Sequence, residues 1–180
     1  GCLGGRGGGV GAFRARLPLE QAALSYGHGS SVTLMQLARA YLAFARDGDL
    51  IPLSLTRQES APIAGKSIFS AQTARQVRAM LELAVQPGGT APRAQIAGYR
   101  VAGKTGTAHK LEGGSYTDRY VAVFVGFAPV SDPRLVVAVM IDEPSAGKYY
   151  GGEVAAPVFA QVMAGSLRTL GVAPDAPLKP

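Results

Sequence analysis

Two long apolar runs constrain the fold of this 180-residue chain more than any other feature of its sequence. They are "RYVAVFVGFAPV" at 119–130 and "RLVVAVMIDE" at 134–143. Each run has strand length and is continuously apolar, which is typical of a strand buried on both faces. The link "PVSDP" at 129–133 is a short proline turn, whereas a parallel connection needs a dozen or more residues. The sequence therefore predicts antiparallel strands at 120–128 and 134–142.

Two helices are predicted before this hairpin. Thr33 and Gln36 form a capping box in front of an apolar stripe at helical spacing, and Gly48 ends the helix. The second helix starts after the capping residue Ser70 and stops at the Pro-Gly-Gly sequence of 87–89. The predicted buried stripes are Leu34, Leu37, Ala38, Tyr41, Leu42 and Ala45 in the first helix, and Ala74, Val77, Met80, Leu81 and Ala84 in the second.

The remaining elements complete an α+β pattern. The stretch 50–55 is predicted to be an edge strand or extended chain, and 99–110 a further strand. A last helix is expected from about Ala156, with Pro157 tolerated in its first turn. Its predicted buried face is Val158, Phe159, Val162, Met163, Leu167 and Leu170. The sequence thus predicts an antiparallel sheet flanked by helices.

Composition and charge argue against several function classes. Eighteen Lys and Arg residues against twelve Asp and Glu give a net charge of +6, but these charges form no basic run, which disfavours nucleic-acid binding. Cys2 is the only cysteine and the two histidines lie far apart in sequence, so the spacing predicts no metal site. No cofactor is predicted either. No apolar run reaches the roughly 18 residues of a membrane span, and the run near 135–141 has strand length.

The stretch "GYRVAGKTGT" at 98–107 fits two motifs with different chemistry. Its first eight residues have the spacing of a phosphate-binding P-loop, and Asp142 ends an apolar strand in the manner of a Walker B motif. A P-loop, however, places its lysine and threonine at the N-terminus of a helix. Thr105 is followed by a glycine-broken stretch without helical periodicity. A P-loop NTPase is therefore disfavoured.

The second half of this stretch, Lys-Thr-Gly-Thr at 104–107, matches the third motif of serine enzymes that handle penicillin. On a strand, Lys104 and Gly106 would share one face, and Thr105 and Thr107 the other. A twist or bulge at Gly106 would bring the ammonium and both hydroxyls toward one cleft. These donors suit a substrate with a terminal carboxylate and a carbonyl that becomes an oxyanion, and the glycine leaves room for it. On the motif alone, an exposed strand with a solvated lysine is an equal alternative.

Four colinear segments together resemble the C-terminal part of a class B penicillin-binding protein, most nearly the division-specific peptidoglycan D,D-transpeptidase. The segments are 17–48, 101–110, 120–152 and 155–172. The resemblance implies a partial penicillin-binding transpeptidase or serine β-lactamase-like fold, whose Lys-Thr-Gly strand lines the active-site cleft.

The resemblance also implies a division of the chain and a location. A transpeptidase portion at 17–172 is expected between a flexible Gly/Arg-rich tail at 1–16 and a frayed proline-rich tail at 173–180. The implied location is the periplasmic face of the bacterial inner membrane, with an N-terminal anchor outside this chain.

Roles for individual residues follow from the same resemblance. Lys104 corresponds to the catalytic lysine near the nucleophile, and Thr105 and Thr107 to the hydroxyl donors for the substrate carboxylate. Gly106 belongs to the same substrate-binding strand, and the amide of Thr107 would form half of the oxyanion hole. His28, within "SYGHG" at 25–29, is expected to be structural. The implied partners are the D-Ala-D-Ala end of a peptidoglycan stem peptide, β-lactams, and membrane proteins of the division complex.

The nucleophile motifs of such enzymes are not found in this sequence. The chain has no asparagine, so no S-x-N motif exists, and its one S-x-x-K match is Ser145 to Lys148. The mechanism needs that serine and lysine on one helical turn, whereas Pro144 and Gly147 predict a loop. We therefore expect the isolated chain to be an inactive fragment of a transpeptidase.

Two alternatives remain open at this stage. A β-lactamase or D,D-carboxypeptidase would share the fold and the Lys-Thr-Gly strand. A truncated, non-catalytic binding module would keep the fold and contact partners only.

Overall fold

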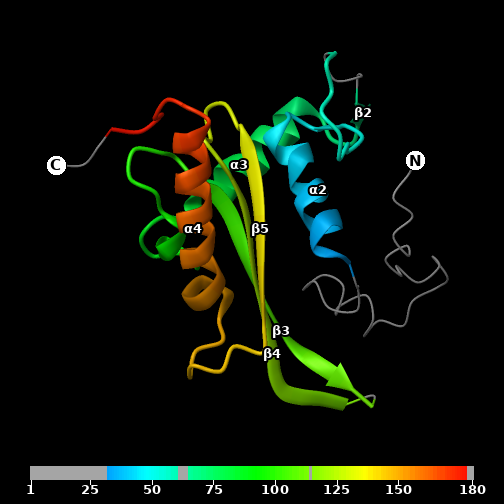
Figure 1. Cartoon of the computed structure of the whole chain (residues 1–180), viewed down its shortest axis with the longest axis vertical. Coiled ribbons are helices and arrows are strands. Elements are labelled where there is room, and N and C mark those ends of the chain that lie inside the picture. The colour runs from blue at the N-terminus through cyan, green and yellow to red at the C-terminus, as the bar shows by residue number, and fades with distance from the viewer. Residues whose placement is uncertain (1–31, 61–64, 114, 178–180) are drawn as a thin grey trace.

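Three long strands form an antiparallel sheet with the order β3-β4-β5 (Figure 1). They are β3 (Ala102–Glu112), β4 (Ser115–Ala128) and β5 (Leu135–Asp142). The structure is a computed structural model that describes residues 32–60, 65–113 and 115–177. β4 and β5 pair in antiparallel register along the whole of β5, which confirms the predicted hairpin.

The predicted burial of the two apolar runs is only partly correct. The second half of β4, from Phe124 to Ala128, is buried, as expected for the central strand. β5 is an edge strand among the described residues, and most of its side chains are half-buried. Met140 is 50% exposed, because only the other face of this part of β5 packs against the main core.

The first two helices begin at the predicted caps. Helix α2 (Leu34–Ala45) starts with the capping box of Thr33 and Gln36, and α3 (Ala71–Leu83) starts after Ser70, whose hydroxyl accepts a hydrogen bond from the Thr73 amide. Arg78 of α3 donates to the carbonyls of Phe44 and Ala45 at the end of α2. This guanidinium satisfies carbonyls that a helix end otherwise leaves unpaired, and so ties the two helices together.

A small two-stranded sheet lies beside these helices, formed by β1 (Asp49–Leu50) and β2 (Lys66–Ser67). The predicted extended stretch 50–55 therefore contributes only its first residue to a strand. β2 and the 3-10 helix η1 (Pro92–Ala94) were not predicted, because elements of two or three residues carry no periodicity.

Helix α4 (Gly151–Thr169) begins five residues earlier than predicted, so Pro157 lies inside the helix instead of in its first turn. An interior proline removes the hydrogen bond to the carbonyl four residues earlier, which here belongs to Glu153. That carbonyl accepts a hydrogen bond of 3.0 Å from Nη1 of Arg93. The arginine therefore replaces the bond that Pro157 cannot make.

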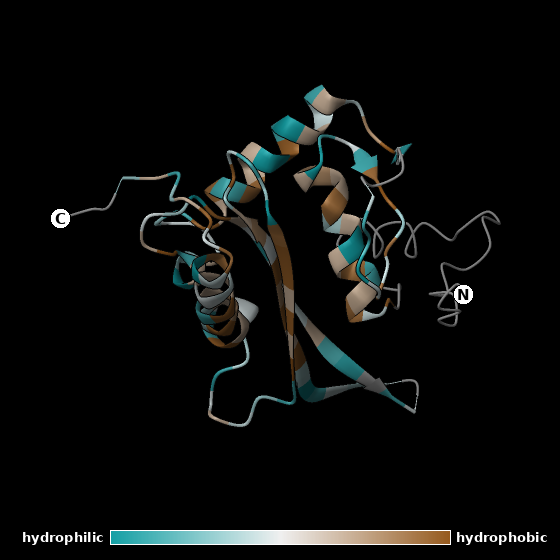
Figure 2. Ribbon diagram, turned by 45° about the horizontal axis from the view of Figure 1, so that its top comes forward, coloured by the Kyte–Doolittle hydropathy of each residue, from teal (hydrophilic) through white to brown (hydrophobic). Residues whose placement is uncertain are grey.

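The helices cover both faces of the sheet, with α4 on one side and α2 and α3 on the other (Figures 1 and 2). The main core lies under α4 and contains Phe124, Phe159, Met163 and Leu167 together with small residues around η1. A smaller core on the other face joins Ala102, Phe127 and Val130 to α2 and α3. The predicted buried faces were too broad, because Leu34, Met80, Val158, Val162 and Leu170 are exposed.

The tail after α4 is docked where fraying was predicted. The Asp175 carboxylate accepts hydrogen bonds from the amide of Arg100 (2.7 Å) and from the amide and hydroxyl of Ser131 (3.1 and 2.8 Å). The Tyr99 hydroxyl donates to the carbonyl of Val172 at 2.6 Å. These bonds attach 172–176 to the segment that leads into β3 and to the β4–β5 turn. A composition rich in proline predicted neither contact.

Replacing Asp175 by alanine is expected to lower the free energy of unfolding by about 1–2 kcal/mol. The change removes three hydrogen bonds to a carboxylate and leaves two backbone amides to solvent. Urea unfolding monitored by circular dichroism measures the effect. The matched control is Asp132→Ala, because Asp132 makes no hydrogen bond or ion pair within the described residues. Equal urea midpoints for the two variants would contradict a docked tail.

Candidate functional site

The residues Lys104 to Thr107 lie in the middle of β3, each opposite one residue of β4 from Val125 to Ala122. No helix starts after Thr105, so the lysine and threonine do not stand at a helix N-terminus. Asp142, at the end of the antiparallel β5, is paired with Lys110 at 3.0 Å. The P-loop interpretation is therefore wrong, and the strand interpretation of this stretch is confirmed.

The backbone of Thr105 and Thr107 points away from β4, toward the other edge of β3. No strand among the described residues pairs with this edge, which is called the open edge here. The Glu143 amide donates to the carbonyl of Tyr120 at 2.9 Å, which shows that the even-numbered residues of β4 bond to the β5 side. Because neighbouring residues of a central strand alternate, the odd-numbered residues of β4 bond to β3. Their partners are Lys104 and Gly106. The amides of Thr105 and Thr107 are thus directed to the open edge.

The hydroxyls of both threonines lie on the face covered by the start of α4. Thr107 Oγ1 accepts a hydrogen bond of 3.1 Å from the amide of Gly151, and Thr105 Oγ1 donates to Thr90 Oγ1 at 3.3 Å. Both threonines are half-buried. Thr107 keeps its hydroxyl proton available for a further acceptor, because it only accepts from Gly151.

The Lys104 ammonium reaches the same edge from the opposite face. Its Nζ donates to the carbonyl of Thr105 at 3.0 Å and to Oγ1 of Thr105 at 3.2 Å. The expected bulge at Gly106 is absent, since the only register shift in β3 lies between His109 and Leu111. The length of the lysine side chain, and not a distortion of the strand, brings the charge beside the hydroxyl.

Gly106 is exposed and has space on its side-chain face. A Cβ atom built there would meet only the Cβ of Val123, at 3.7 Å, which is ordinary contact. The described fold therefore does not itself require glycine at this position. The expected role of Gly106, room for a ligand close to the backbone, stays a prediction.

Charge pairing separates Lys104 from the neighbouring cations. Lys110 pairs with Glu143 at 2.7 Å and with Asp142 at 3.0 Å, and these hydrogen bonds raise the pKa of Lys110. Arg119 pairs with Glu143 and with Glu112. Lys104 makes no ion pair within the part of the chain that the structure describes. It is thus the cation of β3 whose charge remains available to an anionic ligand.

A row of aromatic rings continues from the Lys-Thr-Gly-Thr strand and was missed by the sequence analysis. His109 lies on Tyr120 with ring centroids 4.4 Å apart, and Tyr120 stacks on Tyr149 at 4.0 Å. Tyr149 contacts Tyr150 at 4.5 Å. The row comes from β3, β4 and the segment before α4, so no single stretch of sequence reveals it. It joins β3 and β4 to the segment that leads into α4.

The S-x-x-K match lies in the predicted loop and not on a helix. Ser145 and Lys148 fall between β5 and α4, and Gly147 has a positive φ of 75°. Lys148 Nζ lies 3.7 Å from a carboxylate oxygen of Glu153. The geometry of one helical turn that the mechanism needs is therefore absent here. His28 and the "SYGHG" segment lie outside the described residues.

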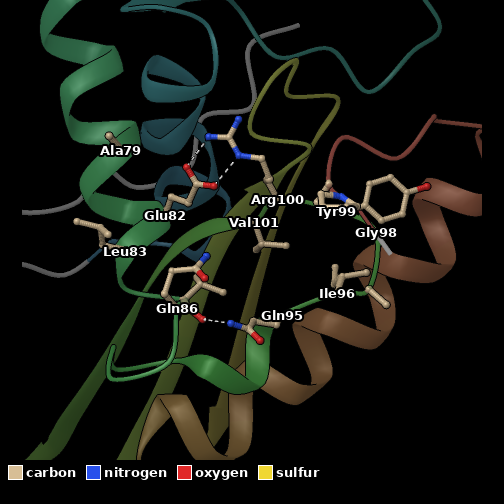
Figure 3. Close-up of a pocket in the computed structure, with 14 residues that line it drawn as sticks. Ala79, Glu82, Leu83, Gln86, Gln95, Ile96, Gly98, Tyr99, Arg100 and Val101 are labelled. Atoms are coloured by element: carbon tan, nitrogen blue, oxygen red, sulfur yellow. Dashed lines mark hydrogen bonds and ion pairs between the residues drawn. The ribbon is translucent and has the colours of Figure 1, made fainter. Parts of the chain in front are cut away.

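A separate cavity of about 790 Å³ lies between α3, the 95–101 segment and the C-terminal tail (Figure 3). Arg100 and Glu82 form a two-point ion pair in its wall, with both N–O distances 2.7 Å, and the Gln95 side chain donates to the carbonyl of Val85. None of the Lys-Thr-Gly-Thr residues lines this cavity.

Within the described ranges, no helix is long and apolar enough to cross a membrane, and no cluster of His, Cys, Asp and Glu is suited to hold a metal.

An antiparallel sheet with helices on both faces and a Lys-Thr-Gly-Thr edge strand defines the class of penicillin-handling serine enzymes. The comparison with protein families agrees and is more specific. Residues 5–164 match the family model described as the penicillin binding protein transpeptidase domain. The chain belongs to this family.

Individual relatives and solved structures support the assignment. The chain is 50% identical over 167 residues to the probable peptidoglycan D,D-transpeptidase PenA of Neisseria gonorrhoeae, covering 92% of this chain and 29% of that protein. It is 45% identical over 159 residues to the peptidoglycan D,D-transpeptidase FtsI of Escherichia coli K12, covering 88% and 27%. The apo TP domain of Burkholderia pseudomallei penicillin-binding protein 3 superposes with a TM-score of 0.88 at 48% identity, covering 94% and 52%. The chain thus spans less than a third of these two curated relatives.

Proposed function

We propose that this chain supplies the substrate-gripping half of a peptidoglycan D,D-transpeptidase site. Lys104 provides the positive charge, and Thr105 and Thr107 provide hydroxyls for the terminal carboxylate of a D-Ala-D-Ala stem peptide or of a β-lactam. The outward amide of Thr107 donates to the carbonyl oxygen as it becomes an oxyanion. Gly106 leaves the backbone accessible to the ligand.

The observation that carries this proposal is the convergence at the edge of β3. The ammonium of Lys104 lies 3.2 Å from the Thr105 hydroxyl, and the Thr107 amide is directed to the same open edge. A substrate in extended form can lie along this edge as an additional strand. Donors fixed by a rigid sheet stabilise developing negative charge without reorganisation during the reaction.

The nucleophile half of the site is proposed to come from the part of the relatives that this chain does not span. No S-x-N motif occurs in the sequence, and Ser145 and Lys148 lie in a loop. In the completed enzyme the serine would attack the carbonyl carbon of the D-Ala-D-Ala peptide bond and form an acyl-enzyme as the terminal D-Ala leaves. An amine of a neighbouring stem peptide would then take the acyl group and release the serine. The chain by itself is proposed to be inactive.

The location and partners are proposed from the family. The complete protein would act at the periplasmic face of the inner membrane, where its peptidoglycan substrate lies, and would be held there by an anchor outside this chain. Its partners would include membrane proteins of the division complex.

Labelling with a fluorescent penicillin tests the proposed division of the site. The isolated chain is expected to give no covalent, denaturation-resistant label. A chimera in which this chain replaces the matching portion of the Burkholderia pseudomallei TP domain is expected to be labelled. In that chimera, Lys104→Ala should slow labelling by about 10²-fold or more, because it removes a fixed charge at the reacting group.

The control variant for this experiment is Ser145→Ala. It should leave labelling of the chimera unchanged, because Ser145 lies in a loop away from a helical turn. Covalent labelling of the isolated chain that disappears with Ser145→Ala would overturn the proposal and identify Ser145 as a nucleophile.

A further inference from the structure

A third hydroxyl stands beside the two threonines of the strand edge. Thr105 Oγ1 receives a hydrogen bond from Lys104 Nζ at 3.2 Å and donates to Thr90 Oγ1 at 3.3 Å. The ammonium and the two hydroxyls thus form a continuous chain. Thr90 belongs to the loop between α3 and η1, fifteen residues before Thr105 in sequence. No motif in the sequence marks Thr90.

The backbone around Thr90 is fixed by its neighbours. The amide of Ala91 donates to the carbonyl of Ala84 at 2.9 Å, and Ala91 is fully buried. Gly152, at the start of α4, packs so closely on this loop that a Cβ atom there would come within 2.2 Å of the Thr90 carbonyl oxygen. The backbone that carries the exposed Thr90 side chain is therefore held in place by the end of α3 and the start of α4.

We propose that Thr90 is a positioning residue that acts through the hydroxyl of Thr105. The group that it serves is the set of carboxylate donors of Lys104, Thr105 and Thr107, which we call the carboxylate grip. This inference rests on the proposed function of the strand edge. Without an anion, the single proton of the Thr105 hydroxyl is directed to Thr90. A hydroxyl both donates and accepts, and its hydrogen can rotate.

When a carboxylate occupies the edge of β3, the Thr90 hydroxyl turns and donates to Thr105. Thr105 then accepts from Lys104 and Thr90 and donates its own proton to the carboxylate. Both acceptor positions of this oxygen are filled by donors, and such chains strengthen each hydrogen bond in them. Thr90 thereby sets the direction of the Thr105 proton without touching the ligand.

The test uses the 180-residue chain and two probes, benzylpenicillin and its methyl ester. Amide chemical shifts of Thr105 and Thr107 are followed by NMR during titration. Thr90→Val, which keeps the shape and removes the hydroxyl, is expected to weaken carboxylate binding about tenfold, the effect of losing a hydrogen bond to a charged system. Thr90→Ser should restore binding to within about twofold of the parent chain, and the ester should bind all three proteins equally.

The acylation rate of the chimera described above gives a second readout of the same comparison. There, Thr90→Val should slow reaction with benzylpenicillin and not with the ester. A role in stability alone would shift the urea midpoint and affect both probes alike.

Thr105→Val distinguishes the proposed role of Thr90 from the proposed carboxylate binding at the edge of β3. Unchanged carboxylate binding in Thr90→Val, with a loss in Thr105→Val, would overturn the role of Thr90 and leave the proposed function standing. Unchanged binding in both variants, or equal binding of acid and ester by the parent chain and the chimera, would overturn the carboxylate grip itself.

Discussion

Phe159→Ala is expected to lower the free energy of unfolding by about 3–5 kcal/mol, a large part of the stability of a domain of this size. Phe159 is fully buried between α4 and the sheet, and its ring lies 4.7 Å from that of Phe124. The substitution removes the apolar burial of a whole ring and leaves a cavity at the centre of the main core. Urea unfolding measured by circular dichroism gives the change.

The matched control is the adjacent residue of the same helix. Val158 is 39% exposed, so Val158→Ala should cost less than about 1 kcal/mol. The double variant with Phe124→Ala should be less destabilised than the sum of the single variants, because the two rings contact each other. A similar loss for Phe159→Ala and Val158→Ala would show that α4 does not pack on the sheet through Phe159.

The sequence was informative wherever one continuous segment determined the result. The hairpin of β4 and β5 follows from two apolar runs and a short proline turn. The starts of α2 and α3 follow from side chains that cap the helix locally, at Thr33 and Ser70. The alternation of Lys104 and Thr105 follows from the strand itself.

The sequence failed where distant segments decide the outcome. The start of α4 at Gly151 depends on close packing against β3 and β4, and Pro157 is tolerated because Arg93 supplies a hydrogen bond from another element. The docked tail depends on Asp175 reaching Arg100, seventy-five residues away. Local propensity contains none of these contacts.

The candidate site divides in the same way. Lys104 to Thr107 could be found as a motif, because four adjacent residues carry the chemistry. Thr90 could not be found in this way, since it joins the site only through the hydrogen bond between its hydroxyl and that of Thr105 in β3. The aromatic row of His109, Tyr120 and Tyr149 likewise depends on three elements meeting in space.

Gly152→Ala is expected to destabilise the chain by about 2–3 kcal/mol, within the range for forcing atoms into a filled space. The added Cβ would lie 2.2 Å from the Thr90 carbonyl oxygen and 3.5 Å from Cγ2 of Thr105. The nearer neighbour is backbone, so relief requires the α3–η1 loop or the start of α4 to move. Alanine also gains about 1 kcal/mol of helix propensity over glycine, and the clash must exceed this gain.

Gly165→Ala in the same helix is the control, because a Cβ atom there meets nothing within 4 Å. This substitution should stabilise the chain by about 0.5–1 kcal/mol through helix propensity alone. Identical changes in one helix are thus expected to move the urea midpoint in opposite directions. If Gly152→Ala were also stabilising, α4 would not start against the Thr90 loop.

Because a forced shift would also carry the Thr90 hydroxyl away from Thr105, Gly152→Ala should weaken carboxylate binding as well, whereas Gly165→Ala should leave it unchanged.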